Sequence, residues 1–105
     1  MNEQIKKEIV QRITRNLLDI QILRLINAEP MWGYKIKKTI EATVDIKLRH
    51  GALYPLLNSL EKKGFLTSQK QKQGGRIRKV YSITTEGKNY LTAYHSILKE
   101  QIPQE

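Results

Sequence analysis

The fold is decided by residues 49–64, which read RHGALYPLLNSLEKKG. The segment carries four leucines at the spacing that places them on one buried face of a helix: Leu53, Leu56, Leu57 and Leu60. Pro55 has no backbone N–H, so the helix cannot begin much before Gly51. Gly64 follows the last leucine, where a left-handed residue commonly ends a helix. We therefore predict one helix, buried along its leucine face.

The opposite face of this helix is polar and has no carboxylate before Glu61. Its side chains are His50, Ala52, Asn58 and Lys62, with Tyr54 on the flank. Arg49 and His50 lie at the N-terminal end, the part of a recognition helix that points at base edges of DNA. Arg49 and Asn58 each suit a base edge or a phosphate. Tyr54 either donates to a phosphate or packs on the domain, and the pattern favours neither.

The next segment predicts a basic β-hairpin. Residues 65–73 form the first strand, Gly74-Gly75 is a turn signal, and residues 76–83 alternate apolar and polar side chains. The part near the turn has no acid and carries the basic residues Lys70, Lys72, Arg76, Arg78 and Lys79. Such residues suit backbone phosphates and position a protein on DNA. The alternative is a solvated hairpin whose charges only protect an edge strand.

Residues 2–28 predict one long helix that ends at Glu29-Pro30, because the residue before a proline leaves the helical region. Its second half is apolar on more than one face, as expected if a partner also covers it. Thr14 offers an alternative, as the cap of a separate second helix.

Residues 31–42 predict a further helix with Lys35 on its outside, and residues 44–48 allow a short strand. Lys35 and Lys47 join the predicted DNA-binding residues.

Thr84 is a suitable cap for a last helix, which continues to about residue 102. Aromatic and aliphatic residues recur along it at helical spacing. A dimer interface is favoured over an effector pocket for Tyr90 and Tyr94, although an apolar cleft between subunits can serve both purposes. The predicted interface joins the first and last helices through Ile5, Ile9, Ile13, Leu17, Ile20, Tyr90, Leu91, Tyr94, Ile97 and Leu98.

The composition favours a polyanionic partner. The chain of 105 residues has 19 Lys and Arg against 10 Asp and Glu, a formal net charge of +9. Nucleic acid is the first interpretation and an acidic membrane surface the second. Cysteine is absent, His50 and His95 have no carboxylates at ligand spacing, and no enzyme motif is found. We expect no enzyme activity, cofactor or metal. Without a signal-peptide pattern or an apolar span, we expect a cytoplasmic protein with no membrane partner.

Together these patterns predict one α+β, mostly helical domain over residues 1–105, a winged helix-turn-helix. Residues 1–28 and 84–102 are its dimerisation helices, and residues 30–83 are its core. The predicted function is sequence-specific binding of double-stranded DNA by a homodimeric transcriptional regulator. The alternative is an architectural or protein-interaction module that does not read sequence. A single-stranded or RNA binder would show aromatics among the basic strand residues, and residues 69–79 have none.

Four segments resemble the PadR-like transcriptional regulators, in the family's order and spacing. They are residues 30–36, 51–57, 60–66 and 75–87. The resemblance implies a homodimeric repressor with a basic wing, in which the first and last helices form the dimer. It also implies the short type of member with a single C-terminal helix. Some such members bind a small aromatic effector between the subunits.

The sequence departs from that pattern at three positions and in its last helix. Trp32 stands where the family often has histidine or another small or polar residue. Arg49 and Ala52 stand where it often has serine and threonine, so the usual hydroxyl cap and some hydroxyl–phosphate contacts are lost, and Arg49 and His50 are the candidates to replace them. The last helix has no tryptophan, so a tryptophan-lined effector pocket is not expected.

Overall fold

The predicted central helix is present as α4 (His50–Lys62) in the computed structural model, which describes residues 2–102. Leu53, Leu57 and Leu60 are buried and Leu56 is half-buried, so the leucine face is confirmed. Pro55 lies inside the helix on its exposed side. Gly64 adopts a φ of 84°, a left-handed conformation that suits glycine at the end of a helix.

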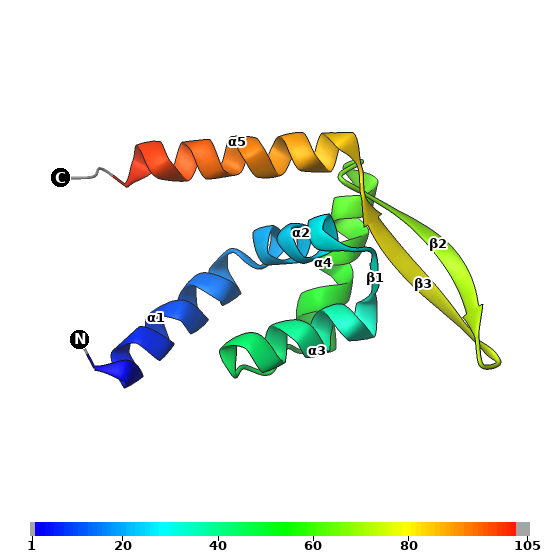
Figure 1. The fold of residues 1–105 in the computed structure, drawn as a ribbon, viewed down its shortest axis with the longest axis horizontal. Helices are drawn as coiled ribbons and strands as arrows, with labels where there is room; N and C mark the ends of the chain where they lie inside the picture. Colours follow the sequence, from blue (N-terminus) through cyan, green and yellow to red (C-terminus); the bar gives the residue numbers. More distant parts are fainter. Residues whose placement is uncertain (1, 103–105) are drawn as a thin grey trace.

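The hairpin is also present, as β2 (Leu66–Gln73) and β3 (Arg76–Ile83) in antiparallel register. Gly74 and Gly75 have φ values of 54° and 80°, as a two-residue turn with two left-handed positions requires. The hairpin projects on the side of the molecule away from both termini (Figure 1). It therefore extends a basic strip well beyond the helical body.

The short strand was predicted in the wrong place. Met31 and Trp32 form β1 (Met31–Trp32) and pair with Tyr81 and Val80 on the free edge of β3. The sheet order is β1-β3-β2. Consequently α3 (Gly33–Val44) begins two residues later than the helix predicted from residue 31.

Residues 44–48 do not form a strand, because local contacts hold their backbone. Asp45 has a φ of 54° and ends α3. The Leu48 N–H donates to the Glu41 carboxylate at 2.8 Å, which lowers the pKa of Glu41. The Gln11 side chain donates to the backbone oxygens of Val44 and Asp45 at 3.2 and 2.9 Å.

The single long N-terminal helix was a wrong prediction, since the chain forms α1 (Glu3–Asn16) and α2 (Leu18–Ala28). The break lies at Leu17, whose side chain packs against the core. Thr14 does not cap the second helix, because its hydroxyl donates to the Val10 oxygen within α1 at 2.8 Å. After the break α2 lies in the core, while α1 leaves the body of the molecule (Figure 1).

The last helix is α5 (Thr85–Gln101), and Thr84 caps it as predicted, with its hydroxyl accepting from the Gly87 N–H at 3.0 Å. The core lies between α2, α3, α4 and the sheet. It includes Ile20 and Leu91, which are only 3% and 7% exposed, so both belong to the chain's own core and not to the predicted dimer interface. The other core residues are Leu18, Ile22, Leu23, Ile26, Met31, Ile36, Ile40, Ile46, Leu48, Leu53, Leu57, Leu60, Leu66 and Tyr81.

Gly87 is the position where α5 contacts the start of the hairpin. A Cβ atom at Gly87 would lie 2.2 Å from the Phe65 carbonyl oxygen. Alanine in a helix is ordinarily favoured over glycine by about 1 kcal/mol, but here a backbone atom blocks the methyl group. We expect Gly87→Ala to lower the free energy of unfolding by about 1–3 kcal/mol, measured by urea unfolding followed by circular dichroism.

The control for this prediction is Gly51→Ala in α4, where a Cβ would meet no atom within 4 Å. This change is expected to leave stability unchanged or to raise it. A Gly87→Ala protein as stable as the wild type would contradict the close packing of α5 on the hairpin.

Candidate nucleic-acid interface

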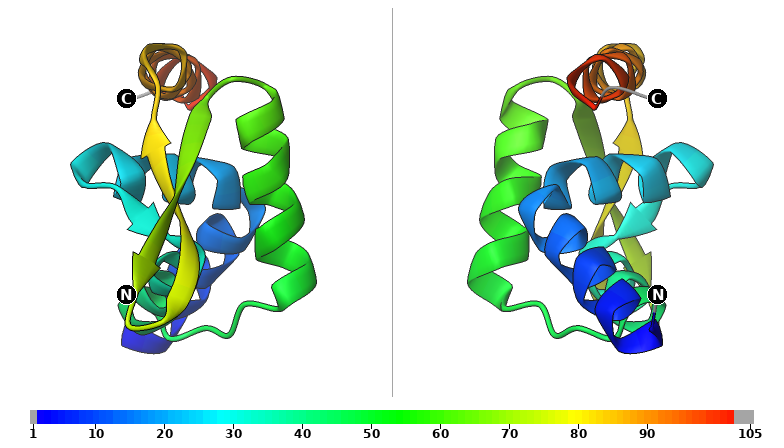
Figure 2. Two further views of the ribbon diagram at one scale, coloured as in Figure 1. Left: turned by 90° about the vertical axis from the view of Figure 1, so that its right-hand side faces the viewer. Right: turned by 90° about the vertical axis from the view of Figure 1, so that its left-hand side faces the viewer.

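The polar face of α4 is open to solvent. His50, Ala52, Asn58 and Lys62 are exposed and Tyr54 is half-buried. Arg49 is the N-cap residue, and its side chain makes no capping hydrogen bond. Figure 2 shows α4 beside the hairpin, with the N-terminal end of α4 and the hairpin turn at the same end of the molecule. A helix with a free polar face thus lies next to a projecting basic hairpin.

Tyr54 fixes the start of α4 against the start of α3. A Cβ at Gly33 would lie 2.7 Å from Cε1 of the Tyr54 ring, so this close approach requires glycine. The Tyr54 ring also stacks on His50, with ring centroids 4.2 Å apart. The packing interpretation of Tyr54 therefore holds in the structure, and a phosphate contact by its hydroxyl stays a prediction.

A cleft of about 540 Å³ separates the hairpin from the two helices beside it. It brings together basic and aromatic side chains that are distant in sequence. The lining residues are Trp32, Gly33, Tyr34, Tyr54, Asn58, Arg76, Ile77, Arg78, Lys79 and Tyr81. Trp32, Tyr34 and Ile77 were absent from the predicted interface. Ile77 could have been found from the sequence, because it is an apolar residue between two arginines, and it is 71% exposed.

Trp32 holds Arg78. The guanidinium carbon of Arg78 lies 3.6 Å from the centre of the indole ring, a close cation–π contact. The aromatic neighbour of Trp32 is Tyr34, at 5.2 Å between ring centroids. Tyr90 stacks on Phe65 at 4.3 Å.

Trp32 is the one tryptophan of the chain, so its fluorescence reports this contact. We expect Arg78→Ala to shift the emission to longer wavelength, because the indole loses the group that covers it and becomes more hydrated. Lys72→Ala, a change near the hairpin turn, is the control and should leave the spectrum unaltered. Identical spectra for wild type and Arg78→Ala would argue against the stacked arrangement.

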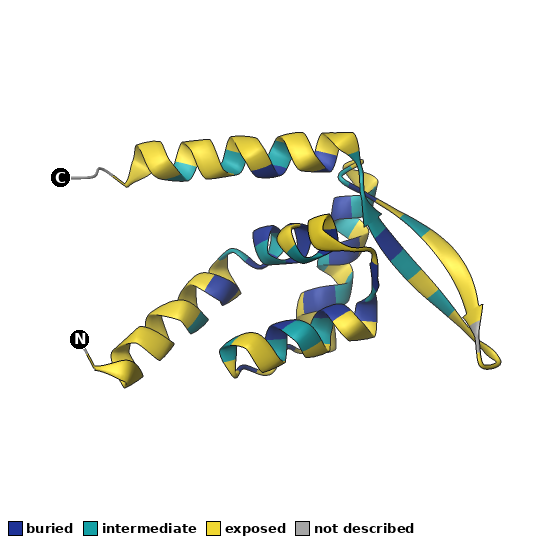
Figure 3. Ribbon diagram, in the orientation of Figure 1, coloured by how far each residue is buried: buried dark blue, intermediate teal, exposed yellow. Residues whose placement is uncertain are grey.

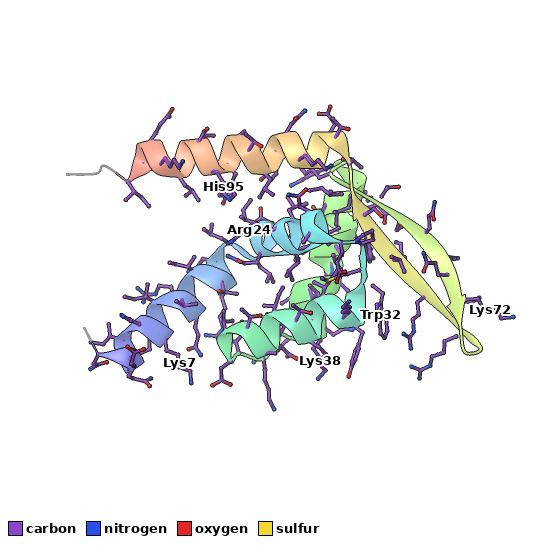
Figure 4. All side chains as sticks on the ribbon, in the orientation of Figure 1. Lys7, Arg24, Trp32, Lys38, Lys72 and His95 are labelled. Carbon is purple, nitrogen blue, oxygen red and sulfur yellow. The ribbon has the colours of Figure 1, made fainter. Side chains whose placement is uncertain are left out.

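The other cations of the predicted interface differ in their partners. Lys79 forms an ion pair with Glu61 of α4, with Nζ 2.8 Å from the carboxylate, and Lys35 pairs with Glu29 at 3.0 Å. The hydrogen bonds from Lys79 and Ser68 lower the pKa of the Glu61 carboxyl. Six other cations of the predicted interface are exposed and form no ion pair among residues 2–102: Lys47, Arg49, Lys62, Lys70, Lys72 and Arg76. Figure 4 shows Lys72 pointing outward at the far end of the hairpin.

A second exposed surface lies on α1 and α5, which project from the body as two arms (Figure 3). On α1, Ile5, Ile9 and Ile13 are 45–47% exposed, and on α5, Ile97 is 55% exposed. Leu17, Tyr90, Tyr94 and Leu98 are half-buried. Lys7 of α1 forms an exposed ion pair with Asp45, at the end of α3, at 2.6 Å. The arms thus present apolar side chains that the single chain does not cover.

Two negative findings concern residues 2–102. No helix there is both long and apolar enough to cross a lipid bilayer. In the same part of the chain, no three His, Asp or Glu side chains are grouped as metal ligands would be.

The arrangement of α2, α3 and α4 followed by the β2–β3 hairpin defines a winged helix-turn-helix protein, with α4 in the place of the recognition helix and the hairpin as the wing. Residues 22–93 match the model of the transcriptional regulator PadR-like family, and this match covers more than half of the 105 residues. The chain belongs to the PadR-like family of transcriptional regulators. It is therefore a regulator and not an enzyme.

Individual relatives agree with this assignment. An uncharacterised protein of Lysinibacillus sphaericus is 36% identical over 84 residues, or 76% of each chain. The PadR family regulator of Eggerthella lenta is 29% identical, with a TM-score of 0.77 over 94% of this chain and 87% of that one. Bacillus subtilis PadR, solved in complex with operator DNA, is 26% identical, with a TM-score of 0.69 over 85% of this chain. The match covers 48% of the Bacillus subtilis chain.

Proposed function

We propose that this chain is a sequence-specific repressor that binds double-stranded DNA as a homodimer. The observation that carries the proposal is the exposed polar face of α4 beside a projecting basic wing. Such a face fits the major groove, while the wing reaches flanking phosphates. The complex of Bacillus subtilis PadR with its operator supports the DNA partner. The repressor role rests on the family resemblance.

In this proposal the contacts to DNA divide by element. Base edges are read by Arg49, His50 and Asn58, because Arg49 is the exposed N-cap residue of α4 and the other two lie on its exposed face. The other residues of the predicted interface either contact backbone phosphates or pack beside the DNA. They are Lys35, Lys47, Ala52, Tyr54, Lys62 and the basic residues of the wing. Lys35 contributes only if it leaves Glu29.

The experiment that tests this proposal is selection of bound duplexes from a random library by the purified protein. We expect an inverted repeat, since a two-fold symmetric dimer places two recognition helices on one face of DNA. The half-site centres should lie about 34–36 Å apart, or a multiple of that spacing. Enrichment of no motif would instead favour an architectural module.

The proposed dimer pairs the α1 and α5 arms of two chains. It is supported by the apolar residues that remain exposed there, and burying them would remove a large apolar area from water. Ile20 and Leu91 are not part of this interface, because the core of each chain already covers them.

We expect the double change Ile9→Glu and Ile13→Glu to convert the dimer to a monomer, measured by sedimentation equilibrium. Both side chains are exposed in the single chain, so the fold should persist and the circular dichroism spectrum should stay the same. Glutamates at these positions would bury unpaired charges in the dimer. A variant that sediments as a dimer would exclude this face from the interface.

The family resemblance extends the proposal to a small aromatic effector between the arms. The half-buried Tyr94 and exposed Ile97 on α5 support it, because an aromatic ring and aliphatic side chains are available there. Release of the selected duplex by a planar aromatic compound, measured by anisotropy, is the test.

A further inference from the structure

Glu61 is a carboxylate on the recognition helix, a place where a negative charge opposes DNA binding. It lies in the last turn of α4 and points toward the wing, where it contacts both strands. The Ser68 hydroxyl of β2 donates to one carboxylate oxygen, and the Lys79 amine of β3 lies 2.8 Å from the other. One side chain of the recognition helix therefore joins both strands of the wing.

These contacts occupy Lys79. Its amine lies between the Glu61 carboxylate and the ring of Tyr81, whose centroid is 5.3 Å away. Tyr81 is buried, so this end of the wing is anchored in the core. By contrast Lys72, seven positions earlier and nearer the turn, is exposed and points away from the body (Figure 4).

We infer that Glu61, Ser68 and Lys79 form a clamp that sets the angle between the recognition helix and the wing. Glu61 and Lys79 are positioning residues for DNA binding, and Lys79 is not a phosphate contact. The phosphate contacts of the wing fall to its exposed cations that have no ion pair among residues 2–102. Lys72 and Arg76 lie near the turn, and Lys70 lies on the neighbouring strand opposite Lys79. This inference rests on the proposed function, because it concerns how the same surface holds DNA.

The clamp and simple electrostatics predict opposite results for Glu61→Ala. The change raises the net charge by one unit, so charge alone predicts tighter binding of DNA. The clamp predicts weaker binding, by about threefold to tenfold, because a wing that is free to move must lose conformational freedom when it binds DNA. We expect the weaker binding for the selected duplex, measured by fluorescence anisotropy. Binding as tight as the wild type, or tighter, overturns the inference.

The exchange variant E61K/K79E separates the ion pair from the individual charges. It keeps the net charge of the wild type and restores a pair between the same two positions. We expect it to bind more tightly than Glu61→Lys alone, although the single variant carries more positive charge. The reverse order would overturn the clamp, and the comparison remains valid even if Glu61→Ala does not fold.

Lys79→Ala and Lys72→Ala form a matched pair, since each removes one cation from the wing. Lys72→Ala should make the dependence of log Kd on log salt shallower by about one unit for each subunit that loses a contact. Lys79→Ala should weaken binding with the salt dependence nearly unchanged. An equal loss of slope in both variants would make Lys79 a phosphate contact and overturn the inference.

The clamp can also be tested without DNA. Because the chain has no cysteine, nitroxide labels can be placed at Ala52→Cys on α4 and Gln71→Cys on β2, both at exposed positions. Double electron–electron resonance should give a narrow distribution of the distance between the two labels. The change Glu61→Ala should broaden this distribution. An unchanged width overturns the clamp. A wild-type protein that binds all duplexes equally would instead contradict the proposed function and leave this measurement valid.

Discussion

Replacing Lys70, Lys72 and Arg76 together with alanine is expected to weaken DNA binding on the order of a hundredfold. These side chains are exposed on the wing, and none forms an ion pair among residues 2–102. Each phosphate contact releases a counterion, so a dimer that loses six contacts should have a log–log salt slope shallower by about five. Fluorescence anisotropy across a salt series measures both quantities.

The loss should be the same for the selected duplex and for a scrambled one, because phosphate contacts carry no sequence information. The matched control replaces three exposed cations on α2 and α5, Arg24, Lys88 and Lys99, and gives the same net charge. The salt dependence of DNA binding by this control should have nearly the wild-type slope. If both triple variants lose slope equally, binding depends on net charge and the wing has no particular role.

Leu57→Ala is expected to cost about 2–5 kcal/mol in the free energy of unfolding. Leu57 lies on the buried face of α4 and is completely inaccessible to solvent, so truncation leaves a cavity between the recognition helix and the core. Since domains of this size are stable by only about 5–15 kcal/mol, the change removes a large share of the total. Urea unfolding followed by circular dichroism measures it.

The neighbouring residue provides the control, because Asn58 lies on the exposed face of the same helix. Asn58→Ala should leave the free energy of unfolding within about 0.5 kcal/mol of the wild type and should relax the preference at particular base pairs. If Leu57→Ala left stability intact, the packing of α4 on its leucine face would be wrong. A uniform loss of affinity in Asn58→Ala would make this residue a phosphate contact.

Local patterns predicted α4 and the hairpin well. The leucine spacing, the position of Gly64 and the Gly74-Gly75 turn each depend on neighbours in sequence, and all three are confirmed. The exposed face of α4 follows directly from the same leucine spacing, because it is the side of the helix without leucines. The breaks in these patterns were harder to predict, because Leu17 continues the apolar repeat of α1 and yet adopts a non-helical conformation.

Contacts between distant elements could not be predicted from one sequence. The pairing of Trp32 with Val80 creates β1, and no local signal distinguishes residues 31–32 from the helix that follows. The same holds for the Arg78–Trp32 contact and the Glu61–Lys79 pair, which depend on the angle of the wing. As a result the sequence identified the basic residues of the wing but not the difference between those that are anchored and those that are free.

The most direct test of the central claim compares two duplexes by fluorescence anisotropy at a fixed, physiological salt concentration. One duplex carries the selected inverted repeat, and the other has the same composition in scrambled order. A sequence-specific regulator should prefer the first by about a thousandfold or more. Equal affinity for the two duplexes would contradict the claim that α4 reads DNA sequence.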